Sequence, residues 1–253
     1  MSTKEEDVVT HFLGASTHAD LLFFTDYGKA YQTKMYDIPE GRRATKGKSI
    51  MNFLPLAGDE KVTSVLAVPK GGAQEKMGVF FVTEQGVVKK VEAKSFADVR
   101  RSGIIAISLK GGDKLVSAHL ANEKDSVSIV TSKGQSIRFA AEDVRAMGRT
   151  AAGVRGMTVK KGDSVVSAEV VPESAKESAL LVVMSKGYGK KTDLVLKLRK
   201  SQRKREKLLV QKFLWMRLSK RERLWSSQRK GRSSVLQLVR FHLCLAQHKV
   251  YVL

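Results

Sequence analysis

Lysine and arginine side chains recur at equivalent places in this sequence, and contact with phosphate groups is the chemistry that they suit. One set follows a series of predicted β-hairpins, at Arg42, Arg43, Lys46 and Lys48, at Arg100 and Arg101, and at Arg149 and Arg155. A second set lies on the second strand of the predicted hairpins, at Lys89 and Lys90, at Arg138, and at Lys190 and Lys191. On one rim of a repeated structure these cations would neutralise phosphates along a bent duplex without reading its bases. The alternative is a solvated sheet edge, where lysine also blocks pairing with other strands.

Residues that would support an enzyme or a metal centre do not gather in the sequence. The single cysteine, Cys244, excludes a disulfide framework and a cysteine-based zinc site. The histidines are scattered, and we interpret His119 as a half-exposed structural residue of a repeated strand. The acidic residues Asp59, Asp113 and Asp163 each occupy a turn, which is typical of turn chemistry and not of an acid–base pair. We therefore expect no catalytic residue, no metal site and no cofactor.

The composition of the chain is basic but uneven. The 253 residues carry a formal net charge of +21, and 42% of them are hydrophobic. Most of the basic excess, both tryptophans and the cysteine lie in residues 195–253, so the total charge is weaker evidence for a polyanionic partner than it first indicates. The acidic N-terminus has no signal-peptide core, and no apolar stretch is long enough to span a membrane. We expect a cytoplasmic protein.

The first 194 residues are an internal repeat. Four glycines, Gly28, Gly86, Gly134 and Gly187, each lie between two alternating apolar strands, at spacings of 58, 48 and 53 residues. Such a glycine fills the left-handed position of a hairpin turn. A second glycine follows in three of the units, at Gly47, Gly103 and Gly153, and then come a third strand, a Gly-Asp turn and a fourth strand. Four-stranded units of this length predict an all-β fold of sheets arranged as blades around an axis.

The repeats divide the chain into parts with definite boundaries. We predict the last strand of a preceding blade in 1–19, blades in 20–70, 71–124 and 125–173, the opening hairpin of a further blade in 174–194, and an aberrant basic tail in 195–253. The ring of blades is therefore expected to be incomplete.

Beyond this pattern, the residues resemble a known family. The segment LLFFTDYGKAYQTKMYDIPEGRRATKGKSIMNFLPL, which begins at Leu21, is similar to the C-terminal domains of DNA gyrase A subunits, and the resemblance continues to about Thr192. The matching elements are the F-x-T-x-x-G-x-x-Y hairpin, the IPE before R-x-A-T-x-G, and a repeated S-x-G-x-x-x-R pattern. The corresponding domain of the topoisomerase IV C subunit is a close alternative. A protein-interaction propeller with a basic rim is a more distant one.

The resemblance implies a fold and a function. The fold is a six-bladed β-pinwheel, a propeller-like ring whose blades exchange strands. The function is binding and bending of double-stranded DNA by the rim, as a non-catalytic module of a type IIA topoisomerase in the bacterial cytoplasm and nucleoid, together with the gyrase A and B subunits. The rim residues that it carries over are Arg42, Arg43, Lys46, Arg100, Arg101, Arg149 and Arg155.

Two departures from the family pattern limit what the resemblance implies. The sequence lacks the basic, glycine-rich heptapeptide that wraps DNA in the family, and it lacks the breakage-reunion domain with its catalytic tyrosine. We therefore expect a fragment that binds duplex DNA weakly, does not wrap it with a defined handedness, and does not cleave it.

The composition of the tail changes abruptly where a further repeat is expected, and its residues fit a repeat translated in the wrong reading frame. Codons can be chosen that encode Lys230 to Leu236 and that, when read from one base earlier, encode KGQVIRT. This peptide is close to SKGQSIRF at 132–139. Continued to the end, suitable codons give a sequence that repeats the pattern of Ile38 to Met51. We predict that 195–253 is frame-shifted and disordered, since such a segment was never selected to bury a core. The rival interpretation is a genuine basic tail that binds DNA.

Overall fold

The computed structural model describes residues 13–38, 48–68, 77–175, 179–183, 189–193 and 249–250. The long strands of the three described repeats are β1 (Asp20–Thr25), β2 (Lys29–Lys34), β4 (Val62–Val68), β5 (Gly78–Thr83), β6 (Val87–Glu92), β8 (Leu115–Ala121), β9 (Ser126–Thr131), β10 (Ser136–Ala140) and β12 (Val165–Val171). Short strands are β3 (Lys48–Ser49), β7 (Ile104–Ile105), β11 (Val154–Arg155) and β15 (Lys249–Val250), and a further hairpin is formed by β13 (Ala179–Val183) and β14 (Gly189–Asp193). The helical turns in these ranges are all 3-10, at η1 (Met35–Asp37), η2 (Ile50–Asn52), η4 (Ala93–Phe96), η5 (Ala141–Asp143) and η6 (Glu173–Ala175). The predicted all-β class is confirmed.

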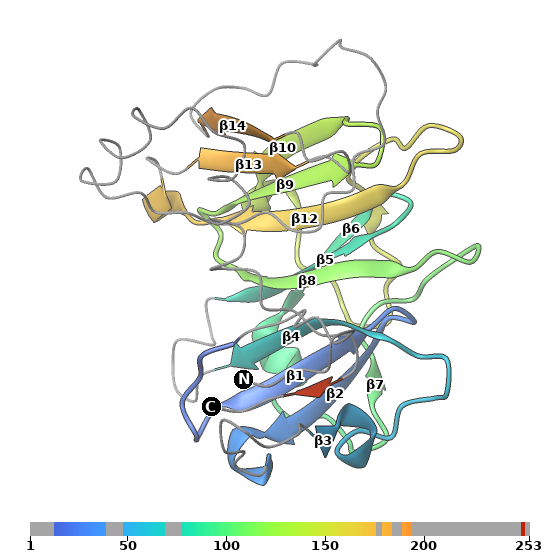
Figure 1. Cartoon of the computed structure of the whole chain (residues 1–253), viewed down its shortest axis with the longest axis vertical. Coiled ribbons are helices and arrows are strands. Elements are labelled where there is room, and N and C mark those ends of the chain that lie inside the picture. Colours follow the sequence, from blue (N-terminus) through green and yellow to red (C-terminus); the bar gives the residue numbers. More distant parts are fainter. Residues whose placement is uncertain are drawn as a thin grey trace, which may run out of the picture.

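Three antiparallel sheets form the body, and they lie one above another along the long axis of the molecule (Figure 1). The strand order is β4-β1-β2-β7 in the first blade, β8-β5-β6-β11 in the second and β12-β9-β10 in the third. Strands β4, β8 and β12 contact one another from blade to blade. They therefore form the inner edges of the sheets, and β7, β11 and β10 form the outer edges.

The hairpin glycines have the predicted left-handed conformation. Gly28, Gly86 and Gly134 have φ of 74°, 80° and 77°. At each of them the glycine N–H donates to the carbonyl of the threonine three residues earlier, as Gly28 does to Thr25 at 2.9 Å. Because an L side chain is strained at this φ, glycine at these three positions fixes where each sheet turns.

Neighbouring blades exchange strands, as the resemblance implies. Strand β7 belongs to the second repeat but pairs with β2 of the first blade, with Ile104 opposite Ala30. Strand β11 of the third repeat pairs in the same register with β6 of the second blade, with Val154 opposite Val88. Each of these two blades is therefore completed at its outer edge by the repeat that follows it.

The third strand of each repeat is shorter than the sequence indicates. The pattern predicts longer strands around Ile50, Ile104 and Val154, but each ladder covers two residues. In the second repeat the carbonyl of Gly28 accepts hydrogen bonds from the N–H groups of both Ala106 (2.9 Å) and Ile107 (3.2 Å), so the chain turns at that point and crosses to the next blade. The hairpin glycine thus has two roles: it forms the hairpin turn, and its carbonyl marks the end of the exchanged strand.

The hydrophobic core lies between the blades. Phe24 of β1 packs edge-on against Phe81 of β5, with ring centroids 5.1 Å apart, and against Phe96 of η4 at 5.6 Å. Phe80 points the other way on β5 and joins Val127 and the rest of a second cluster that connects the second and third blades. Strand β5 is buried on both faces because one face packs against the first blade and the other against the third. Burial of each such aromatic ring stabilises a contact between repeats and not only within one.

Several predictions lie outside the described residues. These are the first strand of the chain up to residue 12, Gly47, Gly187 and almost all of the tail. Within the tail, Lys249 and Val250 pair with Ser49 and Lys48 of β3.

Candidate nucleic-acid interface

The outer edge of the first blade carries Arg100 and Arg101, in the loop that leads to β7. This loop is held against β2, because the side-chain oxygen of Gln32 accepts a hydrogen bond from the N–H of Val99 at 3.0 Å. A turn then follows, in which the N–H of Gly103 donates to the carbonyl of Arg100 at 2.8 Å. Both arginine side chains are exposed.

The outer edge of the second blade carries Arg149 and Arg155. The segment that contains them follows β6 along its length: the N–H of Met147 donates to the carbonyl of Lys90 at 2.8 Å, and Arg155 lies opposite Val87. Arg155 is exposed and Arg149 is half-buried. The same construction therefore presents arginines at the outer edges of two successive blades.

Lys89 does not belong to this surface, and its prediction as a phosphate contact is wrong. Its side chain is fully buried, with 0% of its surface exposed. The ammonium group donates hydrogen bonds to the carbonyls of Ala106 (2.8 Å), Ala151 (2.9 Å) and Arg149. Burial, together with the positive charge of Arg149, lowers the pKa of Lys89 to about 8. Lys89 is a structural clamp that holds the exchanged segment of the third repeat against the second blade.

The other predicted residues are dispersed. Lys48 on β3 and Lys191 on β14 are exposed, and Lys90 on β6 is half-buried. Arg138 on β10 is exposed, and its guanidinium donates to the hydroxyl of Ser126 at 2.7 and 3.0 Å. Lys190 lies on β14. Arg42, Arg43 and Lys46 lie outside the described residues.

Because of strand exchange, the basic residues of one repeat lie on the blade of the preceding repeat. The sequence pattern does not show this shift. Arg100 and Arg101 belong to the second repeat but lie on the first blade, and Arg149 and Arg155 belong to the third repeat but lie on the second. The recurrence along the sequence is preserved in space, because the shift is the same in both cases.

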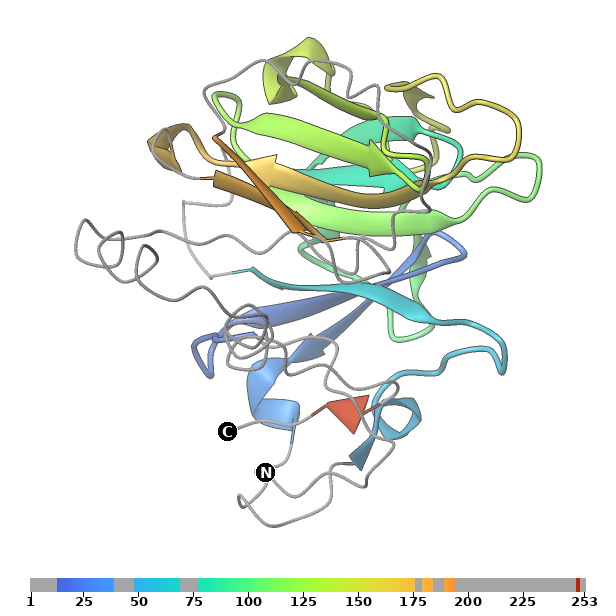
Figure 2. The same cartoon turned by 45° about the horizontal axis from the view of Figure 1, so that its top comes forward.

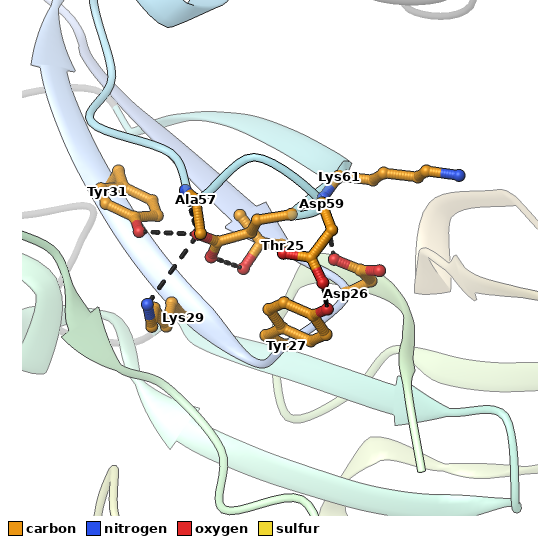
Figure 3. A network of polar contacts seen from close by, with 9 residues as sticks. Thr25, Asp26, Tyr27, Lys29, Tyr31, Ala57, Asp59 and Lys61 are labelled. Atoms are coloured by element: carbon orange, nitrogen blue, oxygen red, sulfur yellow. Dashed lines mark hydrogen bonds and ion pairs between the residues drawn. The ribbon is translucent and has the colours of Figure 1, made fainter. Parts of the chain in front are cut away.

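Carboxylates of the turns are occupied by local hydrogen bonds. In the first blade Glu60 is buried and accepts from the hydroxyls of Thr25 (2.6 Å) and Tyr31 (3.0 Å) and from the N–H of Ala57 (3.2 Å). Figure 3 shows these donors converging, with the Lys29 ammonium 3.9 Å from the same carboxylate. Burial and the bond to Glu60 raise the pKa of Tyr31 to about 12.

The same turn recurs in the other two blades. Asp113 accepts from the N–H of Gln85 at 3.0 Å, and Asp163 accepts from the hydroxyls of Thr131 (2.7 Å) and Ser132 (2.8 Å). The predicted turn role of Asp113 and Asp163 is confirmed, whereas in the first blade Glu60 takes this place and Asp59 bonds to Tyr27. In the described part of the chain no carboxylate forms an ion pair with Arg100, Arg101, Arg149 or Arg155, so these guanidinium groups keep their donors for another anion.

Turn lysines are basic residues that the sequence analysis missed. Lys110, Lys114, Lys160 and Lys161 are all exposed and flank the glycine-containing turns before β8 and β12. The sequences KGGD and KKGD are a usable signal for them, although the pattern alone indicates only turn formation. His119, by contrast, is half-buried as predicted, and its Nδ1 lies 3.8 Å from the Glu169 carboxylate of the next blade.

Metal sites and membrane-spanning helices were also sought in the described ranges. No group of three or more histidine, cysteine, aspartate or glutamate side chains there could hold a metal ion. No helix there has the length and apolarity that a membrane crossing requires.

Comparison with known proteins gives a consistent result. The family described as "DNA gyrase C-terminal domain, beta-propeller" matches residues 19–69, 79–122 and 125–172. The chain is 41% identical over 189 residues to the DNA gyrase A subunit of Salmonella typhimurium, which covers 75% of this chain and 21% of that protein. It is 43% identical over 192 residues to the DNA gyrase A subunit of Deinococcus deserti, which covers 75% of this chain and 23% of that protein. The chain thus spans between a fifth and a quarter of the length of these relatives.

Solved structures agree on the fold. A C-terminal domain of DNA topoisomerase IV matches with a TM-score of 0.70 at 26% identity, over 85% of this chain and 69% of that one. A DNA gyrase A C-terminal domain matches with a TM-score of 0.57 at 23% identity, over 75% of this chain and 62% of that one. Since the family matches more than half of the residues, blade by blade, this chain belongs to the family of β-propeller C-terminal domains of DNA gyrase.

Proposed function

We propose that this chain binds duplex DNA along the outer edges of its blades and bends it, as a non-catalytic module of the DNA gyrase A subunit. The observation that carries the proposal is the presence of exposed arginines on the outer edges of two successive blades, without carboxylate partners in the described residues. Guanidinium groups bind phosphate oxygens in a bidentate manner. The blades of a propeller are arranged around an axis, so contacts on successive blades follow a curved path. A duplex that follows this path is bent.

The proposal extends to the setting of the chain. Its partners would be double-stranded DNA and the gyrase A and B subunits, in the bacterial cytoplasm and close to the nucleoid. The gyrase assignment is favoured over topoisomerase IV because the gyrase family matches all three described repeats and because gyrase A relatives are 41% and 43% identical over three quarters of the chain.

A bending measurement with matched charge variants tests the proposal. Energy transfer between dyes at the two ends of a short duplex is measured on addition of the full chain. Arg101→Gln removes a cation from the outer edge, and Lys124→Gln removes one from the turn between β8 and β9, where Lys124 lies 3.9 Å from Glu173. We expect bending that is reduced in the first variant and unchanged in the second. No bending by the unaltered chain, or equal loss in both variants, would contradict the proposal.

A further inference from the structure

The loops before β4, β8 and β12 project from the same side of the molecule in both views (Figures 1 and 2). The hairpin turns are bonded to these loops, as the N–H of Ser132 is to the carbonyl of Ser164 at 2.8 Å. We call this surface the turn side. Its charge differs from blade to blade: the turns of the first blade contain Asp26, Asp59, Glu60 and Lys61, and those of the third contain Lys133, Lys160, Lys161 and Asp163.

The carboxylate of the third turn is held by local hydrogen bonds. Asp163 accepts hydrogen bonds from Thr131 and Ser132 and from the N–H groups of Lys133 and Ser164, both at 2.9 Å. Although burial alone would raise it, these hydrogen bonds hold the pKa of Asp163 below its usual range. Asp163 therefore stays ionised and offsets one of the three exposed lysines of this turn, Lys133, Lys160 and Lys161, which leaves the turn with a net charge of +2.

A surface hollow lies beside this turn and reaches the outer edge. Its walls include Glu84 and Gln85 of the second blade's hairpin and Arg155, Thr158, Lys160 and Lys161 of the segment that crosses to the third blade. Arg155 is at the same time a residue of β11, the outer strand of the second blade. The hollow therefore continues the arginine-bearing edge onto the turn side.

Two of the three cations of this hollow, Arg155 and Lys161, are not needed to build the turn. The strand registers place Ile105 of the preceding repeat at the position of Arg155 and Gly111 at that of Lys161. The position of Lys160 is held there by another lysine, Lys110. The preceding repeat nevertheless forms the same exchanged strand and the same turn. A fold requirement thus does not account for Arg155 and Lys161, whereas contact with an anion would.

We infer that this hollow seats a phosphodiester of duplex DNA, so that the DNA path leaves the outer edge at Arg155 and crosses the turn side of the third blade. The inference rests on the proposed function. Arg155 supplies a forked donor, Lys160 and Lys161 supply point charges, and the exposed Thr158 hydroxyl supplies a neutral donor. Two carboxylates on the walls oppose an anion, Glu84 and Asp163, and the oxygens of Asp163 already accept the hydrogen bonds described above.

The first test compares two lysine pairs at equivalent turns of the full chain. Lys160→Gln/Lys161→Gln alters the third turn, and Lys110→Gln/Lys114→Gln alters the second. The affinity for one duplex is measured over a range of salt concentrations. Loss of the contact with this one phosphate should reduce the magnitude of the slope of log K against log salt by ~0.9 for the first pair. The second pair should leave the slope close to that of the unaltered chain, and Glu84→Gln should tighten binding.

A second test locates the DNA directly. In a Cys244→Ser background, an iron chelate is attached to Thr158→Cys or to the equivalent Ser108→Cys, and cleavage of the bound duplex is mapped. We expect cuts from position 158 and fewer from position 108. Equal slopes for the two lysine pairs, or equal cutting from the two positions, would overturn the inference. If Arg101→Gln still reduces bending, the proposed function survives that result, whereas a lack of DNA binding by the unaltered chain would contradict both.

Discussion

The Lys89 ammonium donates a hydrogen bond to the carbonyl of Ala151 at 2.9 Å and so joins the second blade to a segment of the third repeat. Tyr31 occupies the same place after the first hairpin glycine, and its ring lies against Gly103 of the following repeat. At the third hairpin this place is held by Ile137, which is only half-buried. One position in each repeat thus receives the exchanged segment wherever the described residues contain that segment.

Replacing Lys89 should destabilise the fold. Lys89→Met removes the ammonium donor from the carbonyls of Ala106, Arg149 and Ala151, of which Ala151 still accepts from the N–H of Ser108 at 3.2 Å. Leaving one buried carbonyl without a donor costs ~1–3 kcal/mol. We expect a clearly lower midpoint of thermal unfolding for Lys89→Met than for Lys90→Met on the same strand. Equal midpoints for the two variants would show that the clamp does not stabilise the fold.

The same residue predicts a pH dependence of stability. The pKa of Lys89 is lowered from 10.5 to about 8, so between these values the unfolded chain binds a proton that the folded chain has released. Its contribution to the free energy of unfolding should therefore rise with pH across this window and stay level, at its lowest value, below about pH 8. Denaturant unfolding of the unaltered chain and of Lys89→Met, measured at several pH values, checks whether the difference between them has this sign.

A cross-repeat contact also requires glycine at position 103. Gly103 has φ of +80°, and a Cβ there would lie 2.6 Å from Cε1 of Tyr31. Gly111 has φ of +60° with nothing within 4 Å of a Cβ. Gly111→Ala should cost ~1–2 kcal/mol from backbone strain alone, and Gly103→Ala should cost more. Chemical denaturation of both variants measures the difference, and a smaller loss for Gly103→Ala would contradict the packing described here.

The outer edge of β10 is a predicted site of self-association. Among the described residues no strand pairs with this edge. Because the N–H of Thr131 donates to the carbonyl of Gln135, the alternation of the ladder turns the N–H of Ser136 away from β9. Ser136→Pro should therefore reduce association in sedimentation velocity without unfolding the chain. Ala30→Pro, at the equivalent but paired position on β2, should unfold it, and unchanged association of Ser136→Pro would exclude this edge.

The sequence predicts the repeats and hairpins well because local turn chemistry determines them. Gly28, Gly86 and Gly134 are each required by a positive φ, so their spacing shows the blades directly. The burial of Lys89 is not predictable from its position in a strand, since it depends on carbonyls 17 to 62 residues away. The shift of the arginines to the preceding blade depends likewise on strand exchange, which follows from the resemblance and not from the pattern of a single repeat.

The tail remains a prediction, because only Lys249 and Val250 are described there. If 195–253 is a repeat translated in the wrong frame, the gene read one base earlier past codon 195 should encode a further repeat with a glycine near position 231. Sequencing the gene decides between this hypothesis and a genuine basic tail. The absence of a repeat in that frame would reject the frameshift.

The central claim is that arginines on the outer edges hold phosphates, and the salt dependence of DNA binding measures this most directly. The slope of log K against log salt is determined for the full chain and for Arg100→Gln/Arg101→Gln/Arg155→Gln, with the fold of each checked by circular dichroism. Three lost contacts should reduce the magnitude of the slope by ~2.7. An unchanged slope in a folded triple variant would contradict the claim and leave the arginines as solvated residues of a sheet edge.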